Sequence, residues 1–194
     1  MKILVVIAHP NTNQSFNHAI ADQVCKTLSL ENHDLIVRDL YAEHFDPVLP
    51  LNEEKLTIEE LPQVIQDNIA DVRAADGLIF IHPNWWGTPP AILKGWIDRI
   101  LRAGFAYKFS ENGVVQLLND KIVQVFTTSN TPQDIELNVY HDPLENFWRN
   151  VVFGLCGAKS FERRNFEPII LSTEEIRASW LQEVGATIQR RFLA

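Results

Sequence analysis

Two adjacent tryptophans, Trp85 and Trp86, stand in the stretch HPNWWGTPP, between an apolar run and a pattern typical of a helix. Prolines on both sides restrict the backbone, and Gly87 permits a close approach or an unusual φ. Flat indole rings suit stacking on a planar heteroaromatic ligand. We expect one tryptophan to face such a ligand and the other to pack into the core. The connection follows the C-terminal end of an expected strand, where open α/β proteins bind ligands.

A second polar connection, AHPNTNQSFN, covers Ala8–Asn17 after the first apolar run. It contains neither GxGxxG nor GxxxxGK[ST], so the sequence predicts neither a standard dinucleotide fingerprint nor a P-loop. Its amides and hydroxyls, with free backbone N–H groups at a helix N-terminus, are suited to holding a phosphate without lysine. Helix capping by Thr12, Asn13 or Ser15 is the alternative, but capping needs only one such residue.

A third polar connection, TTSNTPQD, begins at the end of another buried run. Its hydroxyls, amide and backbone N–H groups would supply donors at one point of the sheet edge. A phosphate site, an aromatic wall and a row of donors are together what a flavin nucleotide requires. The donors expected from this connection are Thr127, Thr128, Ser129 and Asn130.

His9 raises a different chemistry, because AHP after a first strand is also similar to zinc-dependent deacetylases. That similarity requires carboxylate ligands directly after the proline, where this chain has Asn11. The six histidines form no HxH or HxxxH pair. We therefore expect no metal site; His9 would donate to a phosphate oxygen or cap local backbone, and a zinc hydrolase stays as an alternative.

The composition is that of an ordinary globular protein, with 46% hydrophobic residues in a chain of 194. A formal charge of −8 disfavours a nucleic-acid binder, which needs a basic face. The N-terminal apolar run is too short for a signal sequence or membrane span. Cys25 and Cys156 are interpreted as small hydrophobic residues. The protein is expected to be cytoplasmic.

Apolar runs bounded by turn residues alternate with helical patterns along the whole chain, which predicts one domain over residues 1–194. Five strands alternating with helices predict an α/β fold, a doubly wound five-stranded parallel sheet with helices on both faces. Long surface loops are expected at 41–60 and 106–119. The expected strands are Lys2–Ala8, Asp34–Asp39, Gly77–Ile81, Lys121–Thr127 and Ser160–Pro168. The expected helices are Ser15–Leu30, Leu61–Ala75, Ala91–Arg102, Pro143–Leu155 and Thr173–Phe192.

Several segments together resemble the NAD(P)H:quinone oxidoreductase family, the DT-diaphorase-like branch of flavodoxin-like flavoproteins. The resemblance extends to about Asn130, and PAILKGW is its most specific piece. It implies a flavodoxin-like fold and a homodimer with the flavin at the dimer interface. Such a dimer would carry two electrons from NAD(P)H to a quinone by ping-pong kinetics. The matching segments are Leu4–Pro10, Ser15–Asn17, Asp39–Val48, His82–Ile100, Gly104–Phe109 and Thr127–Asn130.

The resemblance also implies a role for individual residues. His9, Ser15, Phe16 and Asn17 would hold the flavin phosphate. Pro83, Asn84, Trp85 and Trp86 would line the flavin ring, and Thr127, Thr128, Ser129 and Asn130 would bond its polar edge. Tyr140 and His141 would assist hydride transfer, although their spacing departs from the family pattern, and TTSN stands where relatives have TTGG.

Several alternatives stay open at this point. The sequence does not separate FAD from FMN, or NADH from NADPH. A flavin-binding regulatory or electron-carrier subunit is an alternative to the enzyme, although the TxTGxT phosphate loop of flavodoxins is absent. Arg99 and Arg102 are interpreted as partners in solvent-exposed salt bridges, with contact to the extra phosphate of NADPH as the alternative.

Overall fold

A five-stranded sheet, entirely parallel and ordered β2-β1-β3-β6-β7, organises the computed structural model, which describes residues 1–192. This confirms the predicted doubly wound sheet. Its strands are β1 (Lys2–Ile7), β2 (Asp34–Asp39), β3 (Gly77–Pro83), β6 (Ile122–Thr128) and β7 (Ser160–Phe166). The longer helices are α1 (Phe16–Ser29), α2 (Gln63–Ala74), α3 (Ala91–Ile100) and α7 (Glu174–Phe192), and α4 (Gln133–Asn138) is short.

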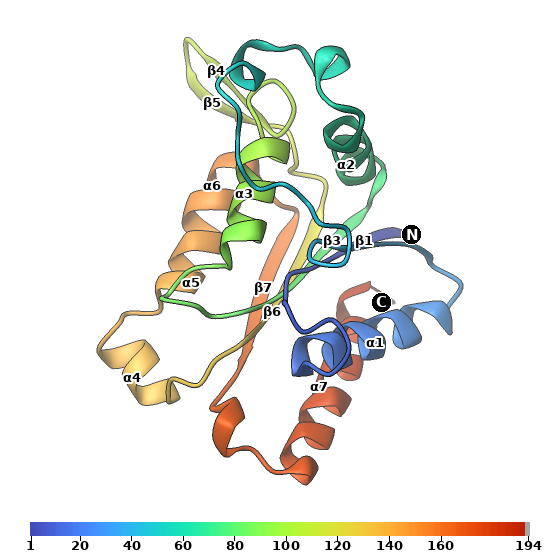
Figure 1. The fold of residues 1–194 in the computed structure, drawn as a ribbon, viewed down its shortest axis with the longest axis vertical. Coiled ribbons are helices and arrows are strands. Elements are labelled where there is room, and N and C mark those ends of the chain that lie inside the picture. Colours follow the sequence, from blue (N-terminus) through green and yellow to red (C-terminus); the bar gives the residue numbers. More distant parts are fainter. Residues whose placement is uncertain (193–194) are drawn as a thin grey trace.

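Alternate residues of the central strands build two cores, one on each face of the sheet. Leu4, Val6 and Phe80 face α2, α3 and the segment 143–156, whereas Val5 and Ile79 face α1 and α7. Figure 1 shows these two helical layers on opposite sides of the strands. Burial on both faces explains why β1 and β3 read as continuous apolar runs.

Two expectations from the sequence need correction. The expected loop at 106–119 contains an antiparallel hairpin, β4 (Tyr107–Ser110) and β5 (Gly113–Gln116). The single helix expected at 143–155 is divided, because a π-helical stretch interrupts it. Its parts are α5 (Pro143–Glu145), the π-helix η3 (Asn146–Val152) and α6 (Phe153–Cys156).

The long segment after β2 is held against α3 by a buried ion pair. Arg99 donates to the Glu53 carboxylate at 2.5 and 3.1 Å and to the Asp46 carbonyl at 2.6 Å. The Arg99 and Glu53 side chains are only 5% and 3% exposed. Arg102 donates to the Glu53 carbonyl at 2.6 Å. The prediction that Arg99 forms a solvent-exposed salt bridge is therefore wrong. Its buried guanidinium holds the segment that carries Asp46 and Glu53 against α3.

Gly95 lets this segment approach the helix closely. A Cβ at Gly95 would lie 2.2 Å from the carbonyl oxygen of Pro47. This close approach gives a physical reason for glycine in PAILKGW. The neighbouring Trp96 is fully buried and donates from Nε1 to the Asn68 side chain at 2.8 Å, which ties α3 to α2.

Within residues 1–192, no helix is both long and apolar enough to cross a bilayer.

Replacing Gly95 by Ala should reduce the free energy of unfolding by about 2 kcal/mol or more, because the new methyl group displaces the backbone at Pro47. Gly154→Ala is the matched control. A Cβ there meets its nearest atom at 3.5 Å, and the exposed helical position should gain about 0.5 kcal/mol. Urea unfolding of both variants measures the difference, and equal stabilities would contradict the close-approach explanation.

Candidate functional site

The polar connections after β1, β3 and β6 meet at one edge of the sheet and enclose a cavity of about 430 Å³, here called the loop cavity. This volume lies in the range of small-molecule sites. The structure brings most of the residues expected at a flavin site to its wall. The lining residues are His9, Asn11, Gln14, Ser15, Phe16, Asn17, Pro83, Asn84, Trp85, Thr128, Ser129, Asn130, Thr131 and Ile169.

The first connection ends where α1 begins, and Ser15 is the N-cap of that helix. Its Oγ accepts from the backbone N–H of His18 at 3.1 Å. The His18 ring bridges Ser15 Oγ and the Asp39 carboxylate, at 2.7 and 2.8 Å. The N-terminal N–H groups of a helix favour an anion, and the loop cavity opens directly onto them.

Asn17 carries the clearest sign of a ligand-binding role. This residue is 2% exposed, and its Nδ2 donates to Thr128 Oγ1 at 3.0 Å. Its Oδ1 is buried without a partner in residues 1–192. A rotated amide would bond Thr128 through Oδ1 instead and would leave Nδ2 unpaired. In either orientation one polar atom of the Asn17 amide is buried without a partner, in a residue that lines the loop cavity.

His9 lines the loop cavity between the start of α1 and the tryptophan turn, with its ring centroid 6.4 Å from that of His18. Its Nδ1 lies 3.1 Å from the backbone nitrogen of Asn11, and its ring centroid lies 6.5 Å from that of Trp85. Burial lowers the pKa of His9. The same Nδ1 lies 3.3 Å from the Asn11 carbonyl oxygen. In the neutral tautomer that accepts the shorter hydrogen bond at Nδ1, the proton is on Nε2, which can donate to a ligand oxygen.

Trp85 and Trp86 belong to a tight turn in which Trp85 and Thr88 exchange two backbone hydrogen bonds of 3.1 Å. The two central residues, Trp86 and Gly87, have φ of +57° and +70°, as a type I′ turn requires. The Trp85 side chain is 41% exposed and that of Trp86 is 100% exposed. The expectation that one of them packs into the core is wrong, because the turn directs both rings outward.

His82, directly before this turn, is fully buried and neutral. Its Nδ1 lies 2.8 Å from the Pro83 carbonyl, and Trp148 Nε1 donates to its Nε2 at 3.0 Å. Burial lowers the pKa of His82 to about 4. The ring therefore fixes the end of β3 and takes no part in binding.

The third connection contributes Thr128, Ser129 and Asn130 to the loop cavity, but not Thr127. Thr127 is fully buried on the other face of the sheet, where its Oγ1 donates to Asn165 at 2.8 Å. Neighbouring strand residues point to opposite faces, so Thr127 and Thr128 cannot both face one ligand. Thr127 accordingly supports the strand and does not line the cavity.

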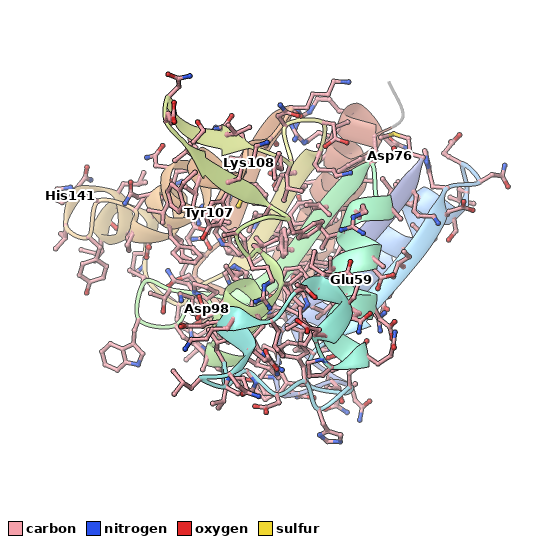
Figure 2. All side chains as sticks on the ribbon, turned by 90° about the horizontal axis from the view of Figure 1, so that it is seen from above. Glu59, Asp76, Asp98, Tyr107, Lys108 and His141 are labelled. Atoms are coloured by element: carbon pink, nitrogen blue, oxygen red, sulfur yellow. The ribbon has the colours of Figure 1, made fainter. Side chains whose placement is uncertain are left out.

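A second cavity of about 570 Å³, here called the outer cavity, adjoins the first and shares Asn84 and Thr131 with it. Trp86 lines this outer cavity, as does Tyr140, whose side chain is 56% exposed. His141 lines neither cavity and lies at the margin of the molecule in Figure 2. The structure thus brings Tyr140 to the site but leaves His141 exposed to solvent.

Several wall residues were not predicted individually. Asn11 and Gln14 belong to the polar run that indicated the phosphate site, so their type was a usable signal. Glu136 lines the outer cavity from α4, a helix whose six residues carry no recognisable pattern in the sequence. Among residues 1–192, no group of three His, Cys, Asp or Glu side chains is arranged to hold a metal ion.

Comparisons with known proteins agree with this architecture. A family model described as a flavodoxin-like fold matches residues 1–188. An "uncharacterized NAD(P)H oxidoreductase" of Haemophilus influenzae is 34% identical, and the alignment covers 100% of this chain and 97% of the relative. Human ribosyldihydronicotinamide dehydrogenase (quinone) is 30% identical, with coverage of 94% and 90%.

Two solved structures have closely similar backbones. Smu.1420 from Streptococcus mutans has a TM-score of 0.87 at 35% identity and covers 98% of this chain and 100% of its own. An NAD(P)H:quinone oxidoreductase from Methanothermobacter marburgensis has a TM-score of 0.85 at 25% identity, with coverage of 100% and 99%. The chain therefore belongs to the flavodoxin-like family of flavin-dependent NAD(P)H:quinone oxidoreductases, as its sequence resemblance predicted.

Proposed function

We propose that the loop cavity binds the flavin nucleotide and that the outer cavity receives NAD(P)H and then a quinone or a similar flat acceptor. The observation that carries this proposal is the unpartnered amide atom of buried Asn17 at the wall of the loop cavity, beside the N-terminus of α1. The family assignment also removes the reason for the zinc hydrolase alternative.

The wall of the loop cavity fits the two ends of a flavin nucleotide. Ser15, Phe16 and Asn17 would hold its phosphate with the first N–H groups of α1, and His9 would add a side-chain donor from the first connection. Asn84 and Trp85 would line the ring, with Thr128, Ser129 and Asn130 along its polar edge. When bound, the flavin would supply the chemistry, accepting a hydride from NAD(P)H and passing two electrons to the acceptor.

The outer cavity offers what a planar substrate needs. Trp86 presents a whole indole face to solvent in a turn that backbone hydrogen bonds and Gly87 hold in place. Tyr140 and Pro143 line the same cavity and would limit the approach of the substrate. Because one cavity serves both substrates, NAD(P)⁺ leaves before the acceptor binds. His141 has no part in this assignment, since its side chain lines neither cavity.

A second copy of this chain is the proposed partner. Leu49 and Val151 are exposed apolar side chains, and both line a cavity of about 400 Å³ between the 47–55 segment, α3 and η3. Val48 and Leu51, beside it, are exposed as well. An apolar area of this kind marks an interaction surface. We infer a homodimer through this face, and a cytoplasmic location, where NAD(P)H is available.

Asn17→Asp should weaken binding of FMN and FAD by about tenfold or more, because a carboxylate replaces an amide of the same shape beside the phosphate. Riboflavin, which has no phosphate, should bind both proteins alike. Asn13→Asp is the control, since Asn13 is on the same connection but does not line the cavity. Fluorescence titration gives the three affinities; an equal loss for riboflavin would contradict the phosphate assignment.

Trp86→Asn should leave thermal stability within about 1 kcal/mol of the natural protein, since the side chain is fully exposed and asparagine tolerates positive φ. The same change should raise the quinone KM by roughly tenfold through the lost stacking surface. Trp86→Phe retains an aromatic face and should stay near the natural value. An unchanged KM in the asparagine variant would remove Trp86 from the substrate site.

Sedimentation equilibrium should give twice the chain mass of 22.2 kDa. The double change Leu49→Asp and Val151→Asp should shift the protein to monomer, because charges in an apolar interface are unfavourable. Leu30→Asp is the control, an exposed leucine just past α1, on the other face of the sheet. A monomer in the natural protein would overturn the homodimer.

A further inference from the structure

Glu136 is a buried carboxyl group at the boundary of two cavities. It is 3% exposed and lines both the outer cavity and a smaller polar cavity of about 280 Å³, here called the charged cavity. Asn84, from the turn that carries the tryptophans, donates from Nδ2 to Glu136 Oε1 at 3.0 Å. Glu136 thus lies between the proposed substrate site and a second polar cavity.

No Lys, Arg or His side chain within residues 1–192 forms a salt bridge with this carboxyl group. The nearby Arg163 donates instead to the Asp142 carboxylate, to Glu145 at 3.0 Å and to Thr127 at 3.1 Å. Glu136 Oε2 has no hydrogen-bond partner in the described chain. It is not among the fully buried side-chain atoms that lack a partner, so it retains some accessible surface. An ion pair therefore does not explain why a carboxyl group is buried here.

The surroundings of Glu136 favour its protonated form. Burial raises the pKa of Glu136, and the Asp142 carboxylate raises it further, while the Asn84 hydrogen bond and the charge of Arg163 oppose the rise. A protonated carboxyl group can accept from Asn84 at Oε1 and still donate from Oε2. This is the form that a general acid must have before it reacts.

We propose that Glu136 is the general acid that protonates the acceptor in the outer cavity. The inference rests on the proposed function, in which a quinone is reduced there with NAD(P)H as the source of electrons. A quinone becomes a hydroquinone by gaining two electrons and two protons. A hydride carries both electrons and one proton, so one further proton must reach the other carbonyl oxygen. The Glu136 O–H bond breaks, the proton forms the hydroquinone O–H, and a carboxylate is left.

The charged cavity provides the route by which Glu136 regains its proton. Glu167 lines this cavity with Glu136, and its buried Oε2 has no partner in residues 1–192. Burial raises the pKa of Glu167 to about 7. A group with that pKa exchanges protons with water near neutral pH, and a polar cavity of this size admits water. The proton then passes from solvent to Glu136 without crossing the bound substrate.

The test separates acceptors that need a proton from those that do not. The holoenzyme is reduced anaerobically with NADPH and mixed in a stopped-flow instrument with a benzoquinone or with ferricyanide, which takes single electrons and no proton. Glu136→Gln keeps the acceptor for Asn84 but has no acidic proton. Reoxidation by quinone should slow by about a hundredfold, while reoxidation by ferricyanide is unchanged.

The pH dependence has a definite sign. In the natural protein the quinone rate should fall as the pH rises through the raised pKa of Glu136, because the acid is then lost. The ferricyanide rate should stay level, and the fall should be absent in Glu136→Gln. Infrared titration of the holoenzyme gives a readout apart from activity: one carboxylic-acid C=O band that disappears with pH should be missing in Glu136→Gln.

Asp134→Asn is the matched control, an exposed acid on the same helix that lines no cavity. Equal slowing with both acceptors, or an unchanged quinone rate in Glu136→Gln, would overturn the assignment. A natural protein that takes up no flavin, or that NADPH does not reduce, would contradict the proposed function itself.

Discussion

The parallel register of β1, β3 and β6 is the constraint on which the site depends. Ile7 pairs with Ile81, and His82 pairs with Thr127, so the chain leaves all three strands at the same edge. Two further hydrogen bonds join Thr128, the last residue of β6, to the segments that follow β3 and β1. Asn84 donates from its backbone to the Thr128 carbonyl at 2.7 Å, and Asn17 donates to the Thr128 side chain. A slip of one strand would separate the phosphate end of the cavity from the tryptophan turn.

The site is also fixed in advance of any ligand. The side-chain amide of Asn84 fixes the turn through both of its polar atoms. Its Oδ1 accepts from the Gly87 N–H at 3.0 Å, and its Nδ2 donates to Glu136. Trp86 stands at a positive φ that costs about 1 kcal/mol for a residue with a Cβ. Its ring is fully exposed, so no burial in the core offsets this cost. Such strain is typical of residues kept for binding rather than for folding.

Much of this arrangement was predictable from the sequence. Strands buried on both faces leave continuous apolar runs, and polar residues after those runs indicated which connections meet. The exceptions have specific causes. Thr127 and Thr128 have the same type, and only strand alternation separates them. Trp86 takes a left-handed conformation that its residue type does not indicate.

Other features depend on contacts between distant segments. Arg99 looks like a surface residue until the segment carrying Glu53 folds over its helix. Glu136 belongs to no sequence motif. Its environment depends on Asn84, which donates to it, and on Arg163, which pairs with Asp142 and Glu145 instead. The burial of such a residue and its hydrogen-bond partners depend on the folded structure, so they cannot be predicted from the spacing of residues along the sequence.

An absorbance titration of the purified protein with NADPH under anaerobic conditions measures flavin binding and flavin reduction together. We expect visible flavin bands in a one-to-one ratio with the chain, and direct bleaching by one equivalent of NADPH to the two-electron reduced form. Heat release of the cofactor would then identify FAD or FMN. A colourless protein that takes up neither flavin, or bands that NADPH leaves unchanged, would show that this protein is not an NADPH-dependent flavin reductase.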